Sequence, residues 1–220
     1  KSARTAARVS GAQPSKRFLS VLFGRGVART TVLLWIAFFC TLLILYLLVN
    51  WLPLLFVNAG YSRPDAAVAT IMFNIGGGLG AIALGTLMDR GRKHLVMLAS
   101  FVGMAAALFA LLLAFRSPGV ALPIAAAAAF GVGVFVIGTQ LALYGTAPNY
   151  YSTAVRGTGV GAAVAAGRVG SIVGPLVAGS LLGAGGNAAS VLTALLPVVA
   201  VAAIAAFLLL YRPPALPIET

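Results

Sequence analysis

The chain has 220 residues, of which 61% are hydrophobic and only 8% are charged, and its mean hydropathy is +1.05. A soluble domain carries about 25% charged residues, because it must cover itself with a hydrated surface. This composition excludes a soluble globular domain and predicts an integral membrane protein with a lipid-facing surface. The apolar runs are long and do not alternate with polar residues, which predicts an all-α protein rather than a membrane barrel.

Six apolar stretches predict a bundle of six transmembrane helices, which occupies residues 30–211. Residues 1–29 are predicted to be a basic cytoplasmic loop or tail, and residues 212–220 a cytoplasmic C-terminal tail. In chain order, the expected helices are Thr30–Val57, Pro64–Met88, Leu95–Phe115, Leu122–Tyr144, Gly157–Leu182 and Ala188–Tyr211.

The positive charges predict the orientation of the bundle. If the N-terminus is cytoplasmic, twelve Lys and Arg lie on the cytoplasmic side: seven before the first helix, three in the second loop, and Arg156 and Arg212. Only Arg63 and Arg116 lie on the other side. The positive-inside rule therefore favours two cytoplasmic termini. The same distribution argues against nucleic-acid binding, despite the net charge of +12.

The sequence carries no constellation typical of an enzyme, a metal site or a cofactor site. His94 and Cys40 are the only residues of their types, so they cannot form a metal cluster of their own kind. The segment 157–162 resembles a dinucleotide fingerprint, but it opens an apolar helix with no strand before it. We therefore predict that the protein is not an enzyme and needs no cofactor.

Arg168 stands in the middle of the fifth predicted helix. A guanidinium in the bilayer core costs roughly 2.5–3.5 kcal/mol on insertion scales and usually faces a cavity or a partner. Its planar fork matches a carboxylate, which favours a substrate-anion or proton-coupling site. The alternatives are a structural pair with an acid, for which only Asp65 and Asp89 are helix-associated, and a side chain that snorkels to the interface.

Polar residues in the other apolar runs are further candidates for substrate binding or proton coupling. Tyr46 and Asn50 are four residues apart, as are Gln140 and Tyr144, so each pair shares one helix face. Two such faces can line a cavity that stacks on and hydrogen-bonds an aromatic ring. The alternative for Tyr144 is the interfacial aromatic belt, and for Asn74 an interhelical hydrogen bond.

Small residues at four-residue spacing predict close contacts between helices. Such seams serve either an interface that slides during transport or simple tight packing. The positions concerned are Gly76 and Gly80 in the second helix, and Ala166, Gly170, Gly174 and Ala178 in the fifth.

The second loop resembles a signature of the major facilitator superfamily. Asp89, Arg90, Gly91, Arg92 and Lys93 are similar to the G-x3-D-R-x-G-R-R motif, with one residue missing after Arg90. The resemblance implies that Asp89, Arg90 and Arg92 belong to a gating loop that stabilises one access state.

Two further segments resemble the aromatic acid/proton symporter branch of that superfamily. Residues 151–161, continuing through 167–175, are similar to the segment that leads through its eleventh helix, with Ser152 where that branch often has proline. Residues 46–55 are similar to its seventh helix. The resemblance spans the chain as helices seven to twelve and implies half of a major facilitator fold.

The resemblance implies proton-driven import of aromatic carboxylates, such as hydroxybenzoates, by alternating access in the bacterial inner (plasma) membrane. The expected partners are the substrate, protons, the lipid bilayer and an N-terminal six-helix half, since the sequence begins at Lys1 rather than at Met. The alternatives are another branch of the superfamily, which carries sugars, organic acids or drugs, and a truncated membrane protein without transport activity.

Overall fold

The fold is known from a computed structural model that describes residues 23–24, 27–91, 93–117, 119–153 and 155–211. The two predicted tails lie outside the described residues, apart from a few positions next to the first helix. Within the described ranges the helices are α2 (Ala28–Asn58), α3 (Arg63–Asp89), α4 (Lys93–Arg116), α5 (Leu122–Thr146), α6 (Arg156–Gly183) and α7 (Ala188–Tyr211), with a short 3-10 helix η1 (Ala147–Tyr150) after α5.

All six α-helices are long and apolar enough to cross a membrane, which confirms the predicted six-helix bundle. Most predicted ends agree within two residues. The main difference is at the end of α5, where η1 carries the helical path on to Tyr150. Pro148 at the start of η1 lacks an N–H and so does not continue the α-helical hydrogen bonding.

The start of α3 is fixed by local hydrogen bonds. The backbone N–H of Asp65 donates to Ser62 Oγ at 3.3 Å, and the Asp65 carboxylate accepts from the Ser62 backbone at 3.2 Å. This reciprocal capping box satisfies two groups that a helix start leaves unpaired. Asp65 therefore has a structural role at one end of the bundle.

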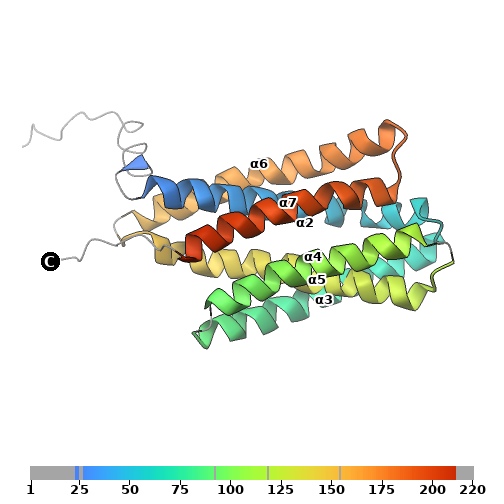
Figure 1. Ribbon diagram of the computed structural model, residues 1–220, viewed down its shortest axis with the longest axis horizontal. Coiled ribbons are helices and arrows are strands. Elements are labelled where there is room, and N and C mark those ends of the chain that lie inside the picture. The colour runs from blue at the N-terminus through green and yellow to red at the C-terminus, as the bar shows by residue number, and fades with distance from the viewer. Residues whose placement is uncertain (1–22, 25–26, 92, 118, 154, 212–220) are drawn as a thin grey trace, which may run out of the picture.

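The six helices lie side by side along the long axis of the molecule, with α4 and α7 in front and α6 and α3 at the two edges (Figure 1). α6 packs mainly on α2, and α3 packs mainly on α5. α7 adds to α2, as α4 adds to α5. These four contacts are related by exchange of α2, α3 and α4 with α5, α6 and α7. The α2–α6 contact then corresponds to α5–α3, and α2–α7 to α5–α4, as expected for a bundle of two inverted three-helix repeats.

Glycines bring each of the two main pairs into backbone contact. A Cβ at Gly170 or Gly174 would collide with the carbonyl oxygens of Phe39 and Leu43 in α2. In the same way, Gly76 and Gly80 of α3 lie against the carbonyls of Phe130 and Val134 in α5. The buried seam of α6 also includes Gly167 and Ala163, whereas Ala166 lies beside it and is only partly buried.

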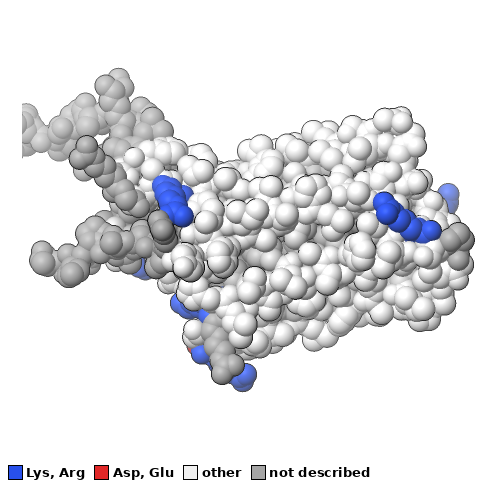
Figure 2. Space-filling model, viewed as in Figure 1, with Lys and Arg blue, Asp and Glu red and all other residues white. Residues whose placement is uncertain are grey.

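Charged side chains gather at the two ends of the bundle, and the length between them is almost free of charge (Figure 2). We call the end where α2 begins and α7 ends the basic end, because the exposed Arg29, Arg90, Lys93 and Arg156 lie there. Arg63 and Arg116 lie at the opposite end. This arrangement is the one expected of a protein that spans a bilayer.

A hydrogen bond between two buried side chains lies at the basic end. The Tyr151 hydroxyl, after η1, donates to Thr31 Oγ1 in α2 at 3.2 Å, and both side chains are buried. Burial raises the pKa of Tyr151, and the bond to Thr31 lowers it in part, so the phenol stays neutral at physiological pH. The bond ties the segment before α6 to the start of α2.

Replacing Tyr151 by Phe is expected to lower stability by about 1 kcal/mol, because the buried Thr31 hydroxyl loses its partner. The thermal midpoint of the detergent-solubilised protein measures the change. Tyr211→Phe is the matched control, since Tyr211 is 71% exposed and its hydroxyl is not buried. Equal midpoints for the two variants would contradict a stabilising role for the Tyr151 bond.

Candidate functional site

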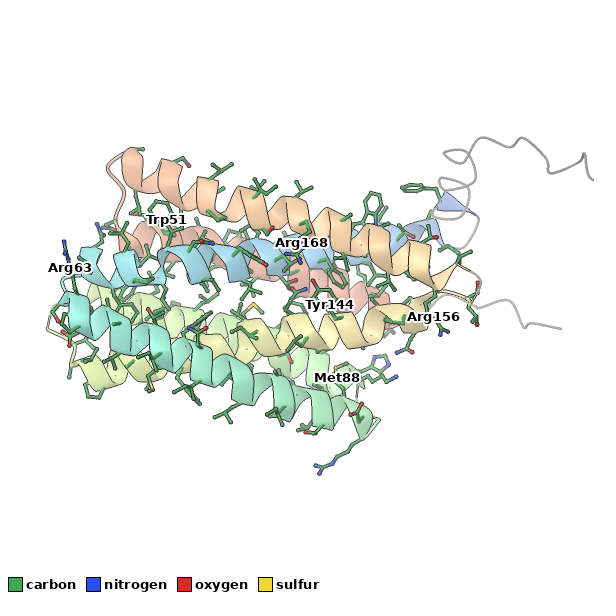
Figure 3. The ribbon with its side chains drawn as sticks, turned by 180° about the vertical axis from the view of Figure 1, so that it is seen from behind. Trp51, Arg63, Met88, Tyr144, Arg156 and Arg168 are labelled. Atoms are coloured by element: carbon green, nitrogen blue, oxygen red, sulfur yellow. The ribbon has the colours of Figure 1, made fainter. Side chains whose placement is uncertain are left out.

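Arg168 lies midway along α6 and points toward α2 (Figure 3). It stands twelve residues after the first residue of α6, or about 18 Å along the helix at 1.5 Å per residue. Its Nη1 donates to the Tyr46 hydroxyl of α2 at 2.9 Å, and the Arg168 side chain is exposed on the surface of this bundle. A permanent positive charge is thus presented at mid-membrane depth.

The main-chain carbonyl oxygens of Tyr46 and Arg168 each accept a hydrogen bond from a polar side chain of the same helix. The Asn50 amide donates to the Tyr46 carbonyl oxygen at 2.7 Å, and the Ser171 hydroxyl donates to the Arg168 carbonyl oxygen at 2.7 Å. Asn50 is exposed, one turn beyond Tyr46. The structure therefore brings three predicted site residues, Arg168, Tyr46 and Asn50, onto one polar patch.

The described acidic residues lie far from this patch. Asp65 is in the first turn of α3, and Asp89 is its last residue. Within the described part of the chain, the guanidinium therefore meets the Tyr46 hydroxyl and not a carboxylate. A guanidinium has five N–H donors, so it can hold Tyr46 and still offer a pair of donors to a carboxylate.

Asn74 occupies the position of α3 that corresponds to Arg168 in α6. Asn74 stands two residues before Gly76 and six before Gly80, as Arg168 stands two before Gly170 and six before Gly174. Both side chains are exposed, and the Asn74 amide donates to the Thr70 carbonyl at 2.8 Å. The two repeats thus place one polar residue each beside their glycine seams.

Gln140 and Tyr144 lie deeper than Arg168. Gln140 is 3% exposed, and its Oε1 and Nε2 have no hydrogen-bond partner among the described residues. The Tyr144 ring packs edge-on against Phe38 of α2, with centroids 5.1 Å apart. Gln140 is therefore inside the bundle rather than on the open polar patch.

The predicted gating loop lies at the basic end. Asp89 and Arg90 are exposed, and Gly91 has φ +82°, which lets the chain turn from α3 into α4. Asp89 also lines a cavity of about 280 Å³ together with Lys93 and with Asn149 of η1. Arg92 lies outside the described residues.

Sequence reasoning missed two features of the site. Phe38 beside Tyr144 was not singled out, because a phenylalanine in an apolar run looks like core. The correspondence of Asn74 with Arg168 was also missed, although its signal is present as a polar residue followed by glycines two and six positions later. A search for this spacing in both halves of the chain would have found it.

A family profile described as Major Facilitator Superfamily matches residues 2–155 and 34–219. The chain is 40% identical to the 3-(3-hydroxy-phenyl)propionate transporter of Escherichia coli over 92% of this chain and 49% of that protein. It is 35% identical to the 4-hydroxybenzoate transporter PcaK of Pseudomonas aeruginosa over 88% of this chain and 42% of that protein. The gallate transporter of Pseudomonas putida is 36% identical over 74% of this chain and 36% of its own length.

The chain thus spans about half the length of the first two curated relatives that it matches. All three relatives are named as transporters and not as enzymes, and their names confirm the resemblance to aromatic acid transporters. The six spanning helices agree with half of the fold that the profile describes. This chain belongs to the major facilitator superfamily.

Proposed function

We propose that this chain is the C-terminal half of a proton-coupled transporter that imports aromatic carboxylates by alternating access. The Arg168–Tyr46 pair carries the proposal, because it presents a guanidinium at mid-membrane depth on an open face. A charge there is costly unless it meets a counter-charge or lines a polar cavity. The relatives' names supply a matching ligand class, an aromatic ring with a carboxylate.

In this proposal the substrate carboxylate binds the Arg168 fork, and the Tyr46 phenol holds the guanidinium in place. Asn50 of α2 and Asn74 of α3, both in the first repeat, offer amide groups to the rest of the substrate. The second six-helix half covers this face and completes the cavity. Two access states then differ by only a few kcal/mol, so that substrate and proton binding can shift their populations.

Proton coupling is assigned to the other half. The sequence contains three acidic residues, and Asp65 and Asp89 lie at the ends of α3, away from the polar patch. A carboxyl group couples proton and substrate binding most directly when it lies near the substrate site. We therefore expect the proton carrier on the N-terminal half, and Asp89 and Arg90 to bias one access state from the loop.

We further propose that the basic end faces the cytoplasm of a bacterium and that the protein lies in the inner membrane. The exposed Arg29, Arg90, Lys93 and Arg156 at that end outnumber the two arginines of the opposite end. The positive-inside rule relates this excess to the cytoplasmic side.

The test is uptake of radiolabelled 4-hydroxybenzoate by cells that express the full native product. Unlabelled 4-hydroxybenzoate is expected to compete about 10- to 100-fold better than 4-hydroxybenzamide, since a hydrogen bond between charged groups contributes about 1.5–3 kcal/mol. A protonophore is expected to stop accumulation. Equal competition by the amide would contradict recognition of the carboxylate, and accumulation that survives the protonophore would contradict proton coupling.

A further inference from the structure

A crevice between α4 and α7 lies at the basic end, away from the polar patch. It has a volume of about 280 Å³ and is lined by His94, Leu98 and Phe101 of α4 and by Phe207, Leu210 and Tyr211 of α7. α4 and α7 form the face seen in front in Figure 1, whereas Figure 3 shows Arg168 from behind. The crevice is therefore not part of the proposed substrate site.

The walls of the crevice are apolar, and its rim is polar. Leu98 and Phe207 are 53% and 54% exposed, and the Phe207 and Tyr211 rings stack with centroids 5.7 Å apart. His94 and Tyr211 bring an imidazole and a phenol to the rim, where both can donate a hydrogen bond. A groove with carbon walls and donors at one mouth fits an amphiphile lying along the helices.

The basic residues near the crevice favour an amphiphile with an anionic headgroup. Lys93 precedes His94, and it is exposed together with Arg90, while Asp89 is the described acid nearby. The positive end of the α4 dipole also lies here, since α4 begins at Lys93. Basic residues beside a membrane attract anionic headgroups, each by a factor of about five.

We propose that this crevice binds an anionic phospholipid, with one acyl chain between α4 and α7 and the phosphate at His94 and Tyr211, next to the exposed Lys93. Lipid tails are as apolar as the crevice walls, so selectivity comes from the headgroup and not from the chain. Lipid binding at this crevice requires that the protein lies in a membrane, and it does not depend on transport activity. Its assignment to the cytoplasmic leaflet rests on the proposed orientation.

The experiment is site-specific photo-crosslinking of the full native product in vesicles of phosphatidylcholine and phosphatidylglycerol at equal mole fractions. In the test protein, p-benzoylphenylalanine replaces Phe207 in the crevice. In the control protein it replaces Val102 of α4, which is 59% exposed and does not line the crevice. Mass spectrometry of the peptide adducts gives the ratio of the two lipids. At Phe207 we expect at least five-fold enrichment of phosphatidylglycerol, and at Val102 the bulk ratio.

The double variant Lys93→Gln, His94→Leu is expected to return the Phe207 ratio to the bulk value. Arg116→Gln, at the other end of α4, is its matched control and should leave the enrichment unchanged. A bulk ratio at Phe207 in the unmodified protein would overturn the proposal, as would enrichment that survives the double variant. Uptake is not measured here, so failure of this site is distinguishable from failure of the proposed transport.

Discussion

Arg168→Ala in the full native product is expected to reduce kcat/KM for uptake of an aromatic carboxylate by about 30-fold or more. Loss of one partner from a desolvated, hydrogen-bonded charge pair costs about 2–5 kcal/mol. Arg168→Lys keeps the charge but removes the planar fork, so an intermediate loss is expected. Tyr46→Phe removes only the hydroxyl that accepts from Arg168 Nη1, and a loss of about 10-fold is expected.

Initial rates of uptake, corrected for the amount of protein in the membrane, measure these losses. Arg168→Ala should insert at least as well as the unmodified chain, because it removes a charge from mid-membrane depth. A weak effect of Arg168→Ala on uptake of a carboxylate would contradict the proposed site and favour a neutral or cationic substrate. Loss of the protein from the membrane would instead indicate a structural role for Arg168.

Gly170→Ala is expected to destabilise the protein by about 1–3 kcal/mol, although alanine is the better helix former. The added Cβ would meet the carbonyl oxygen of Phe39, which is backbone and cannot rotate away. α6 and α2 would have to move apart along the seam. Thermal midpoints in detergent measure the effect, and uptake should fall with it, because Arg168 and Tyr46 lie on the same two helices.

Gly161→Ala is the matched control for this seam. Gly161 is exposed on α6, and a Cβ there would meet nothing within 4 Å. The same substitution should therefore stabilise the helix by about 0.5–1 kcal/mol, because alanine loses less backbone entropy than glycine on folding. Opposite signs at Gly161 and Gly170 are the expected result, and equal signs would contradict the seam.

Much of the fold could be predicted from the sequence because the bilayer imposes it. Each span must satisfy its backbone hydrogen bonds internally and reach across the apolar layer, so long uncharged runs mark the helices closely. The end of α5 departed from this pattern, since Pro148 and Tyr150 form a 3-10 turn within an otherwise apolar stretch. Local turn geometry of this kind leaves little trace in hydropathy.

The site was less predictable than the fold. Arg168 stood out, because a charge in mid-membrane is rare. Its partner did not follow from spacing, since Tyr46 and Arg168 are 122 residues apart and meet only through the packing of α2 on α6. The sequence predicts that Gln140 and Tyr144 share a face that lines a polar cavity, and the structure buries Gln140. Burial depends on which neighbouring helices cover a residue, and the periodicity of one helix does not report that.

The α3–α5 pair lies between the two members of the α2–α6 pair in the sequence, and this order has a consequence for biosynthesis. The Phe39–Gly170 contact joins residues 131 positions apart, whereas the α3–α5 pair lies entirely between them. At about 5–20 residues per second, α2 waits on the order of 10 s for α6 after its own synthesis. During that time the face of α2 that contacts α6 lacks its partner, so we expect α3 and α5 to associate first and α6 to close the outer pair afterwards. A ribosome that stops before Arg156 would leave α2 without the helix that it contacts most.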